Sequence, residues 1–114
     1  MATFTTRVEL HKAAEKEYER LHEAMEVEGF SRVIEGTSGK VYHLPTAEYN
    51  YKGDSTVDDV LAAAKRAAKI TGKASEILVT ESKSRRFSGL VEVSPPETPE
   101  EVLARTVLIF KKSP

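Results

Sequence analysis

The spacing of hydrophobic positions changes along the chain, and the changes divide most of it into strands and helices. Residues 3–10 alternate, with Phe4, Thr6, Val8 and Leu10 on one side and polar residues on the other. This period of two is typical of a strand with one buried face. From residue 12 to residue 28 the period becomes that of an amphipathic helix, whose apolar stripe is Ala14, Tyr18, Leu21 and Met25. Gly29 then supplies the left-handed residue that commonly ends a helix.

A β-hairpin is predicted after this helix. Its strands are residues 30–35 and 40–51, and Gly36-Thr37-Ser38-Gly39 connects them. The glycines lack the spacing of a phosphate-binding loop and join two strands, so we interpret them as a hairpin turn. Pro45 lies within the second strand, and because proline has no N–H to donate to a ladder, we expect a bend there.

A second helix is predicted from Thr56 to Gly72, and a last strand over residues 75–82. Thr56 and Asp59 have the spacing of a helix-capping arrangement. The apolar stripe of this helix is Val57, Val60, Leu61, Ala64 and Ala68. The last strand carries apolar side chains on both faces at its middle, which predicts an internal position in the sheet.

These elements follow the order β-α-β-β-α-β, which predicts an α+β fold of the ferredoxin-like class. We expect an antiparallel four-stranded sheet with two helices on one face, formed by residues 1–83. Residues 84–114 are interpreted as a C-terminal extension. It contains a predicted short helix over residues 98–105, which opens with Thr98-Pro99-Glu100-Glu101. A predicted strand over residues 107–110 follows, and we expect it to pair with a sheet edge and to contribute to a homodimer.

The composition narrows the range of functions. The chain has 114 residues, a formal net charge of −1 and no cysteine. Disulfides and thiolate metal sites are therefore excluded, and the whole chain exerts no general attraction on nucleic acid or anionic membranes. No apolar run reaches the roughly 18–20 residues of a membrane span. The N-terminal residues lack the layout of a signal peptide. We therefore expect a cytoplasmic protein without a membrane partner.

Two groups of cations are candidates for RNA binding. The first lies on the second predicted helix and the second follows the last strand; the candidate residues are Lys65, Arg66, Lys69, Arg85 and Arg86. Together they have enough charge to neutralise several phosphates. Solvated surface charge is the alternative interpretation, since cations near a helix C-terminus also complement its dipole.

The aromatic and histidine residues suggest further chemistry. Tyr42, Tyr49 and Tyr51 lie in the second hairpin strand. On an open sheet face they would stack on RNA bases, and otherwise they would cover core edges or line a dimer interface. The spacing of the three histidines matches no metal-ligand motif, so we predict no metal and no cofactor.

The unit from the first helix to the hairpin resembles the GhoS-type antitoxin family. The resemblance is carried by Tyr18, Arg20-Leu21-His22, Met25, Phe30-Ser31-Arg32-Val33-Ile34 and the region of Leu44, and it covers about residues 2–82. It implies a fold similar to small CRISPR-associated nucleases and cleavage of the messenger RNA of a partner membrane toxin. It also implies that Arg20 and His22 are the functional, catalytic positions.

Two features depart from that family and its nuclease relatives. An arginine is usual at the place of His22, and a histidine there suggests an acid–base role or a packed structural one. The first strand also lacks the terminal aspartate that the CRISPR-associated nucleases use for metal. Moreover, Arg20 and His22 point about 200° apart on a helix, which argues against a simple two-residue site.

The sequence therefore leaves two functional hypotheses. The first is a small cytoplasmic RNA-interacting protein, with endoribonuclease and antitoxin activity implied by the resemblance. The alternative is a non-catalytic protein-binding or dimerisation module of accessory or mobile-element type.

Overall fold

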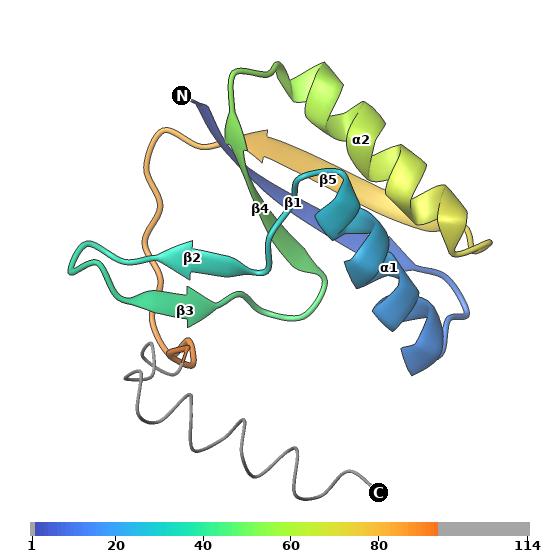
Figure 1. Cartoon of the computed structure of the whole chain (residues 1–114), viewed down its shortest axis with the longest axis horizontal. Helices are drawn as coiled ribbons and strands as arrows, with labels where there is room; N and C mark the ends of the chain where they lie inside the picture. Colours follow the sequence, from blue (N-terminus) through green and yellow to red (C-terminus); the bar gives the residue numbers. More distant parts are fainter. Residues whose placement is uncertain (1, 94–114) are drawn as a thin grey trace, which may run out of the picture.

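The first strand is the centre of the main sheet. In the computed structural model, which describes residues 2–93, β1 (Ala2–Leu10) pairs antiparallel with β4 (Glu48–Gly53) and with β5 (Ser75–Glu81) (Figure 1). The strand order is therefore β4-β1-β5. The helix predicted over residues 98–105 and the strand predicted over residues 107–110 lie outside the described residues.

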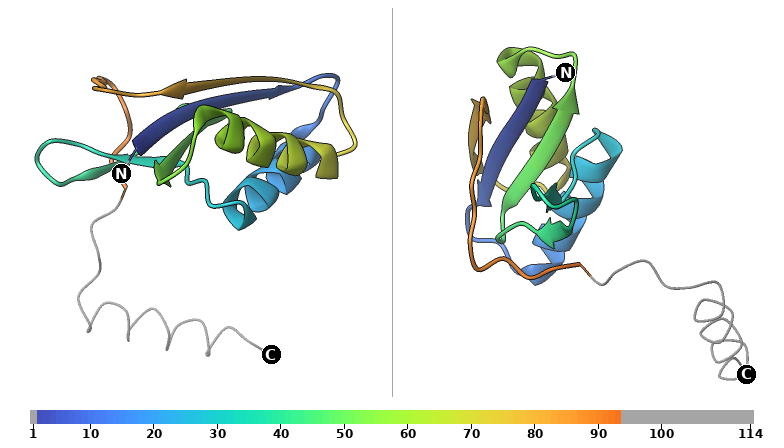
Figure 2. Two further views of the ribbon diagram at one scale, coloured as in Figure 1. Left: turned by 90° about the horizontal axis from the view of Figure 1, so that it is seen from above. Right: turned by 90° about the vertical axis from the view of Figure 1, so that its left-hand side faces the viewer.

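Both helices lie on the same face of this sheet (Figure 2). They are α1 (Glu15–Val27) and α2 (Val57–Ile70), and each begins and ends close to its predicted bounds. Gly29 has a φ of 99°, as expected for the residue that turns the chain out of α1. At the start of α2, the Thr56 hydroxyl accepts a hydrogen bond from the Asp59 N–H at 3.1 Å. The predicted helix stop and the predicted helix cap are thus confirmed. Both could be read from the sequence because each depends on neighbouring residues only.

The alternation of β1 separates the core from the opposite face. Its even-numbered residues from Phe4 to Leu10 are buried against the helices, as predicted. Residues directly opposite one another in an antiparallel pair share a face. Tyr49 lies opposite Thr6 on one side, and Ile77 lies opposite Val8 on the other, so both belong to the helix-covered face. Leu21 and Met25 of α1 are fully buried in the same core.

The predicted second hairpin strand is divided in two at the expected bend. The hairpin consists of β2 (Val33–Glu35) and β3 (Val41–His43), and β4 follows as a separate strand. Pro45 has no N–H for a ladder, and Ala47 has a φ of 71°, which is incompatible with extended backbone. The element order is thus β-α-β-β-β-α-β, with a three-stranded and a two-stranded antiparallel sheet where we expected one sheet of four strands.

A single bridge connects the hairpin to the main sheet. Ser31 and Asn50 exchange two backbone hydrogen bonds of 2.8 and 2.7 Å just before β2 begins. The hairpin then diverges from β4 and extends away from the helices (Figure 1).

The prediction of an internal position for residues 75–82 is wrong for the sheet that residues 2–93 form, because β5 pairs there with β1 alone and lies at the edge. Ile77 and Val79 pack against the core, whereas Leu78 points to the opposite face and is 66% exposed. Apolar residues on both faces do not identify an internal strand when one face is left open.

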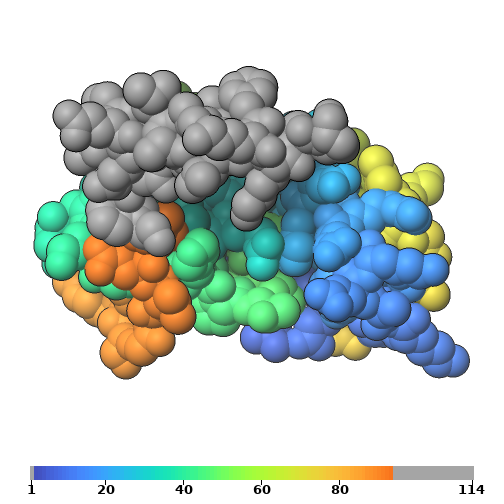
Figure 3. Space-filling model, turned by 60° about the horizontal axis from the view of Figure 1, so that its bottom comes forward, coloured from blue at the N-terminus to red at the C-terminus, as the bar shows by residue number. Residues whose placement is uncertain are grey.

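The chain continues after β5 across the open face of the sheet. We call residues 82–93 the strap. It leaves β5 beside β1, where the Ser82 N–H donates to the Thr3 carbonyl, and reaches the outer edge of β3, where the His43 N–H donates to the Val91 carbonyl. Phe87 packs on Tyr42 with ring centroids 4.9 Å apart. In Figure 3 this segment, in orange, lies directly against the green hairpin. Residues 84–93, which the sequence assigns to the extension, are therefore in contact with the preceding domain.

The burial of Leu21 leads to the first prediction. Leu21→Ala removes a fully buried side chain from the centre of the core and leaves a cavity, so it should lower the free energy of unfolding by about 2–5 kcal/mol. Val27→Ala is the control on the same helix, since Val27 is 86% exposed, and it should cost less than about 0.5 kcal/mol. Urea titration measures both values, and equal effects would contradict the placement of α1.

Candidate nucleic-acid interface

The strap and the hairpin line a polar cavity of about 410 Å³ that is open to solvent. Three cationic side chains line it, Lys83, Arg85 and Arg86, against one carboxylate, Glu35. Hydroxyl groups make up much of the remaining lining, from Thr3, Thr37, Ser38, Ser82 and Ser84. Guanidinium, ammonium and hydroxyl groups all donate hydrogen bonds to phosphate oxygens. The cavity therefore has the chemistry of a site for a phosphate-bearing ligand.

Arg85 is the fixed member of this group. Its Nη1 donates to Asn50 Oδ1 at 2.8 Å and to Thr5 Oγ1 at 3.2 Å, both on the open face of the sheet. Burial lowers the pKa of the Arg85 guanidinium, which remains charged at any physiological pH. The Nε and Nη2 atoms of Arg85 make no hydrogen bond to the described residues, so these donors are available to a ligand. Since its position is set by two intramolecular bonds, Arg85 needs little reordering on binding.

Arg85 also lines two neighbouring hollows. The first hollow lies over β4, and its lining also includes Lys52 and Asn50. The second lies towards Pro45, and its lining also includes Glu48. Lys83, Arg86 and Lys52 are exposed. We call Lys52, Lys83, Arg85 and Arg86 the strap cations. Between residues 2 and 93, none of these four side chains forms an ion pair with a carboxylate. No carboxylate of residues 2–93 therefore neutralises their charge.

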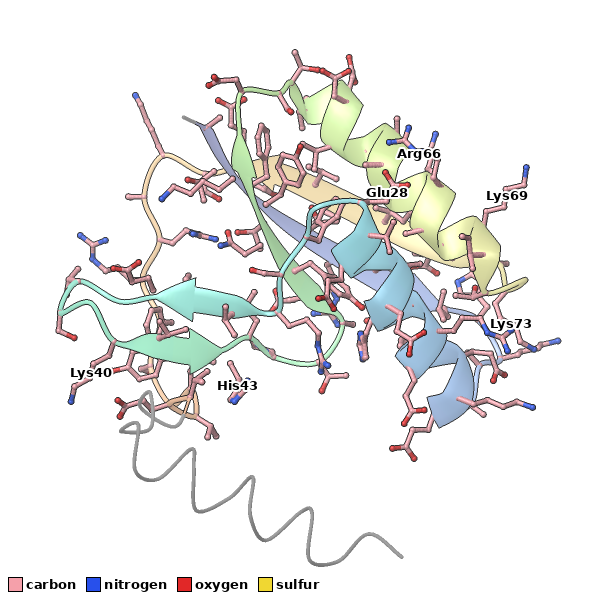
Figure 4. All side chains as sticks on the ribbon, in the orientation of Figure 1. Glu28, Lys40, His43, Arg66, Lys69 and Lys73 are labelled. Carbon is pink, nitrogen blue, oxygen red and sulfur yellow. The ribbon has the colours of Figure 1, made fainter. Side chains whose placement is uncertain are left out.

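On α2, one of the three candidate cations is already paired with a carboxylate. Arg66 forms an ion pair with Glu28 at 2.8 Å, and the two side chains point toward each other in Figure 4. This pair lowers the pKa of Glu28 and raises that of Arg66, mainly through the hydrogen bond between them. Lys65 and Lys69 are exposed. Because α2 lies on the opposite face of the sheet from the strap, the structure does not bring the two predicted cation groups together (Figure 2).

His22 is held by a tyrosine rather than by Arg20. Its Nδ1 lies 2.6 Å from the Tyr49 hydroxyl oxygen. Burial, together with the charge of Arg32, lowers the pKa of His22, and burial raises the pKa of Tyr49 to about 12. His22 lines a cavity of about 320 Å³ with Arg32, Glu23 and Glu26. Arg20 is exposed and does not line it, so the two residues implied by the resemblance do not form one site.

The stacking hypothesis for the tyrosines is wrong for Tyr49, which is 1% exposed within the core. Tyr51 packs on Phe4 and Phe30 on the helix-covered face. Tyr42 packs on Phe87 of the strap. The alternative, that the tyrosines cover core edges, fits Tyr51, which is partly buried against the core, whereas Tyr42 lies outside that core cluster.

Sequence reasoning missed the polar partners that position the strap. Thr5 and Asn50 were not singled out, although Asn50 stands between two tyrosines in a strand. In such an alternation the tyrosines share one face and the asparagine lies on the other. This alternation is a signal that could have placed Asn50 on the face opposite the tyrosines, but nothing in the sequence identifies Arg85 as its partner.

The histidines lie apart from one another. His11 contacts Glu76, His22 contacts Tyr49, and His43 projects from β3 (Figure 4). Within the described part of the chain, no three histidine or carboxylate side chains gather as metal ligands would. None of the helices described here is both long and apolar enough to cross a bilayer.

The environment of His22 predicts a pH dependence. Because its pKa is lower in the folded protein than in the unfolded chain, where it is about 6.5, the unfolded chain binds the proton more tightly. The stability that neutral His22 contributes should be complete above about pH 6.5 and should be lost as the pH falls below it. His22→Gln should remove this part of the pH profile of unfolding. A folded-state NMR titration midpoint of His22 at or above about 6.5 would contradict the account.

Comparison with known proteins does not assign the chain to a family. Models of known protein families give no match, and no curated protein matches the sequence with statistical significance.

Proposed function

We propose that the protein binds single-stranded RNA through the strap cations. The observation that carries this proposal is the cavity in which Lys83, Arg85 and Arg86 face five serine and threonine side chains and a single carboxylate. Cations neutralise phosphates, and serine and threonine hydroxyls hydrogen-bond to phosphate and ribose oxygens. The volume of about 410 Å³ is within the range of pockets that hold a small molecule, so it suits one nucleotide of an unpaired strand rather than a duplex.

The fold supports this proposal as a variant of the ferredoxin-like arrangement. The order β4-β1-β5, with Ser31 bridging to the outer side of β4, has the strand neighbours of a split β-α-β unit. In this interpretation β3 is an addition produced by the break at Pro45. The open sheet face of such folds is a common RNA platform, and here the strap occupies part of it.

Cleavage of a toxin messenger RNA by a cytoplasmic antitoxin is the second candidate function, and it rests on the family resemblance. The observation that favours it is His22, which the Tyr49 hydroxyl orients at the edge of a cavity. With a lowered pKa the imidazole is neutral near pH 7 and suited to accept a proton. Against this, Glu23 and Glu26 outnumber Arg32 in the cavity and disfavour a phosphate. The geometry therefore supports RNA binding better than RNA cleavage.

The RNA-binding proposal predicts which charges matter. The Lys83→Gln, Arg86→Gln double variant removes two exposed strap cations, so it should weaken RNA binding and lower the salt slope of the affinity by about 1–2 units. The matched control is Lys65→Gln, Lys69→Gln on α2, which removes the same charge from the opposite face and should leave the slope nearly unchanged. Fluorescence anisotropy with a labelled single-stranded RNA pool at several salt concentrations measures both.

Two results would contradict the proposal. One is the absence of RNA binding at low salt by the wild-type protein. The other is an equal loss of affinity in the two double variants, which would show that only general charge matters.

The cleavage hypothesis has its own test. If His22 is catalytic, His22→Gln should abolish cleavage of the labelled RNA pool while RNA binding persists, and Arg20→Gln, on an exposed side chain outside that cavity, should cleave normally. Gel analysis with end mapping measures the products. Equal cleavage by wild type and His22→Gln would leave His22 as a structural residue, with RNA binding untouched.

A further inference from the structure

One edge of the main sheet has no partner among residues 2–93. The outer side of β4 is bridged by Ser31, and the outer side of β3 is covered by Val91 and Val93 of the strap. By contrast, β5 pairs with β1 on one side only. Figure 2, in its right-hand view, shows β5 as the outermost strand, with no other strand beside its free edge.

The hydrogen bonds of β5 show which backbone groups reach this edge. The Ser82 N–H donates to the Thr3 carbonyl, and the His11 N–H donates to the Ala74 carbonyl, so even-numbered residues of β5 bond to β1. In an antiparallel ladder the alternate residues direct their N–H and C=O groups to the other side. Ile77 and Val79 therefore present unpaired donors and acceptors outward from the middle of the strand.

The middle of this edge, residues 77–80, also lacks the features that usually prevent strand pairing, since the charged residues Glu76 and Glu81 lie on either side of it. The sequence of β5, SEILVTE, contains no lysine, no proline and no glycine for a bulge. At its middle, Leu78 is 66% exposed on the open face. A hollow of about 280 Å³ adjoins it, lined by Arg7, Glu9, Glu76, Ile77 and Leu78.

We propose that this edge binds a second copy of the chain, with the two β5 strands antiparallel about a two-fold axis at Leu78. In this register Leu78 lies opposite Leu78 of the second copy, and the outward-bonding Ile77 lies opposite the outward-bonding Val79. Moving the axis to Ile77 or Val79 would place Leu78 opposite Glu76 or Thr80 instead. The two-fold at Leu78 is thus the register that matches apolar residues and also satisfies the ladder.

The charges agree with the same register. Glu76 lies opposite Thr80 of the second copy and Glu81 lies opposite Ser75, so no two glutamates face each other across the new pair. Like charges directly opposite would destabilise it. A two-fold pairing also uses both free edges at once, and the assembly closes as a dimer rather than growing into a fibre. This inference depends on the sheet alone and is independent of RNA binding.

Engineered cysteines test the register directly, since the chain has no cysteine of its own. Leu78→Cys places two thiols in a non-hydrogen-bonded pair with Cα atoms about 4.5 Å apart, within reach of a disulfide. Thr80→Cys is the matched control on the same exposed face. Its two copies would be offset by four residues, about 13 Å, which is too far to bridge. Mild oxidation of the full chain should cross-link Leu78→Cys alone on a non-reducing gel.

Sedimentation analysis adds a test without cross-linking. Wild-type protein should shift from monomer to dimer mass as its concentration rises. Leu78→Glu should weaken the dimer at least about tenfold, because it replaces an apolar contact with two opposed carboxylates. A wild-type monomer at every concentration, no cross-link in Leu78→Cys, or equal cross-linking of both cysteine variants would overturn the proposal. Covering of the edge by residues 107–110 of the same chain would produce the first two of these results.

Discussion

The whole arrangement depends on the hydrogen-bonded position of β1 between β4 and β5. Because β1 is paired on both sides, its alternation is imposed on its neighbours, and Tyr49 and Ile77 must face the helices with Val8. The same constraint turns Thr5 and Asn50 to the opposite face, away from α1 and α2. The pairing of β1 therefore produces a buried core on one face of the sheet and a polar surface on the other. We call this polar surface, which includes Thr5 and Asn50, the polar platform.

The polar platform explains why the strap matters. A segment without regular secondary structure gains little from its own backbone, so it must be held by contacts to the sheet. The Arg85 bonds to Thr5 and Asn50 supply them at one end, and the pairing of Val91 and Val93 with β3 supplies them at the other. The contacts that hold the strap also concentrate cations beside hydroxyl groups. On α2, in contrast, Glu28 already partners Arg66. Arg85 thus holds the strap on the sheet and is also part of the proposed RNA site.

Much of the fold could be predicted from the sequence, because many of its signals are local. The helix stop at Gly29, the cap at Thr56 and the break at Pro45 depend on a few adjacent residues and are confirmed. The edge position of β5 and the burial of Tyr49 depend on strand order, which no local pattern specifies. The candidate site was predicted in part: Arg85 and Arg86 were named, but the separation of these residues from the α2 cations follows from the layering of the fold.

The central claim is that the strap face, rather than the helix face, binds RNA. Backbone amide chemical shifts, followed by NMR while a short single-stranded RNA is added, test it most directly. The account predicts progressive shifts in Thr3, Ser38 and residues 82–87, with α2 unchanged around Lys65 and Lys69. Shifts confined to α2 and the end of α1, or none anywhere at low salt, would contradict it.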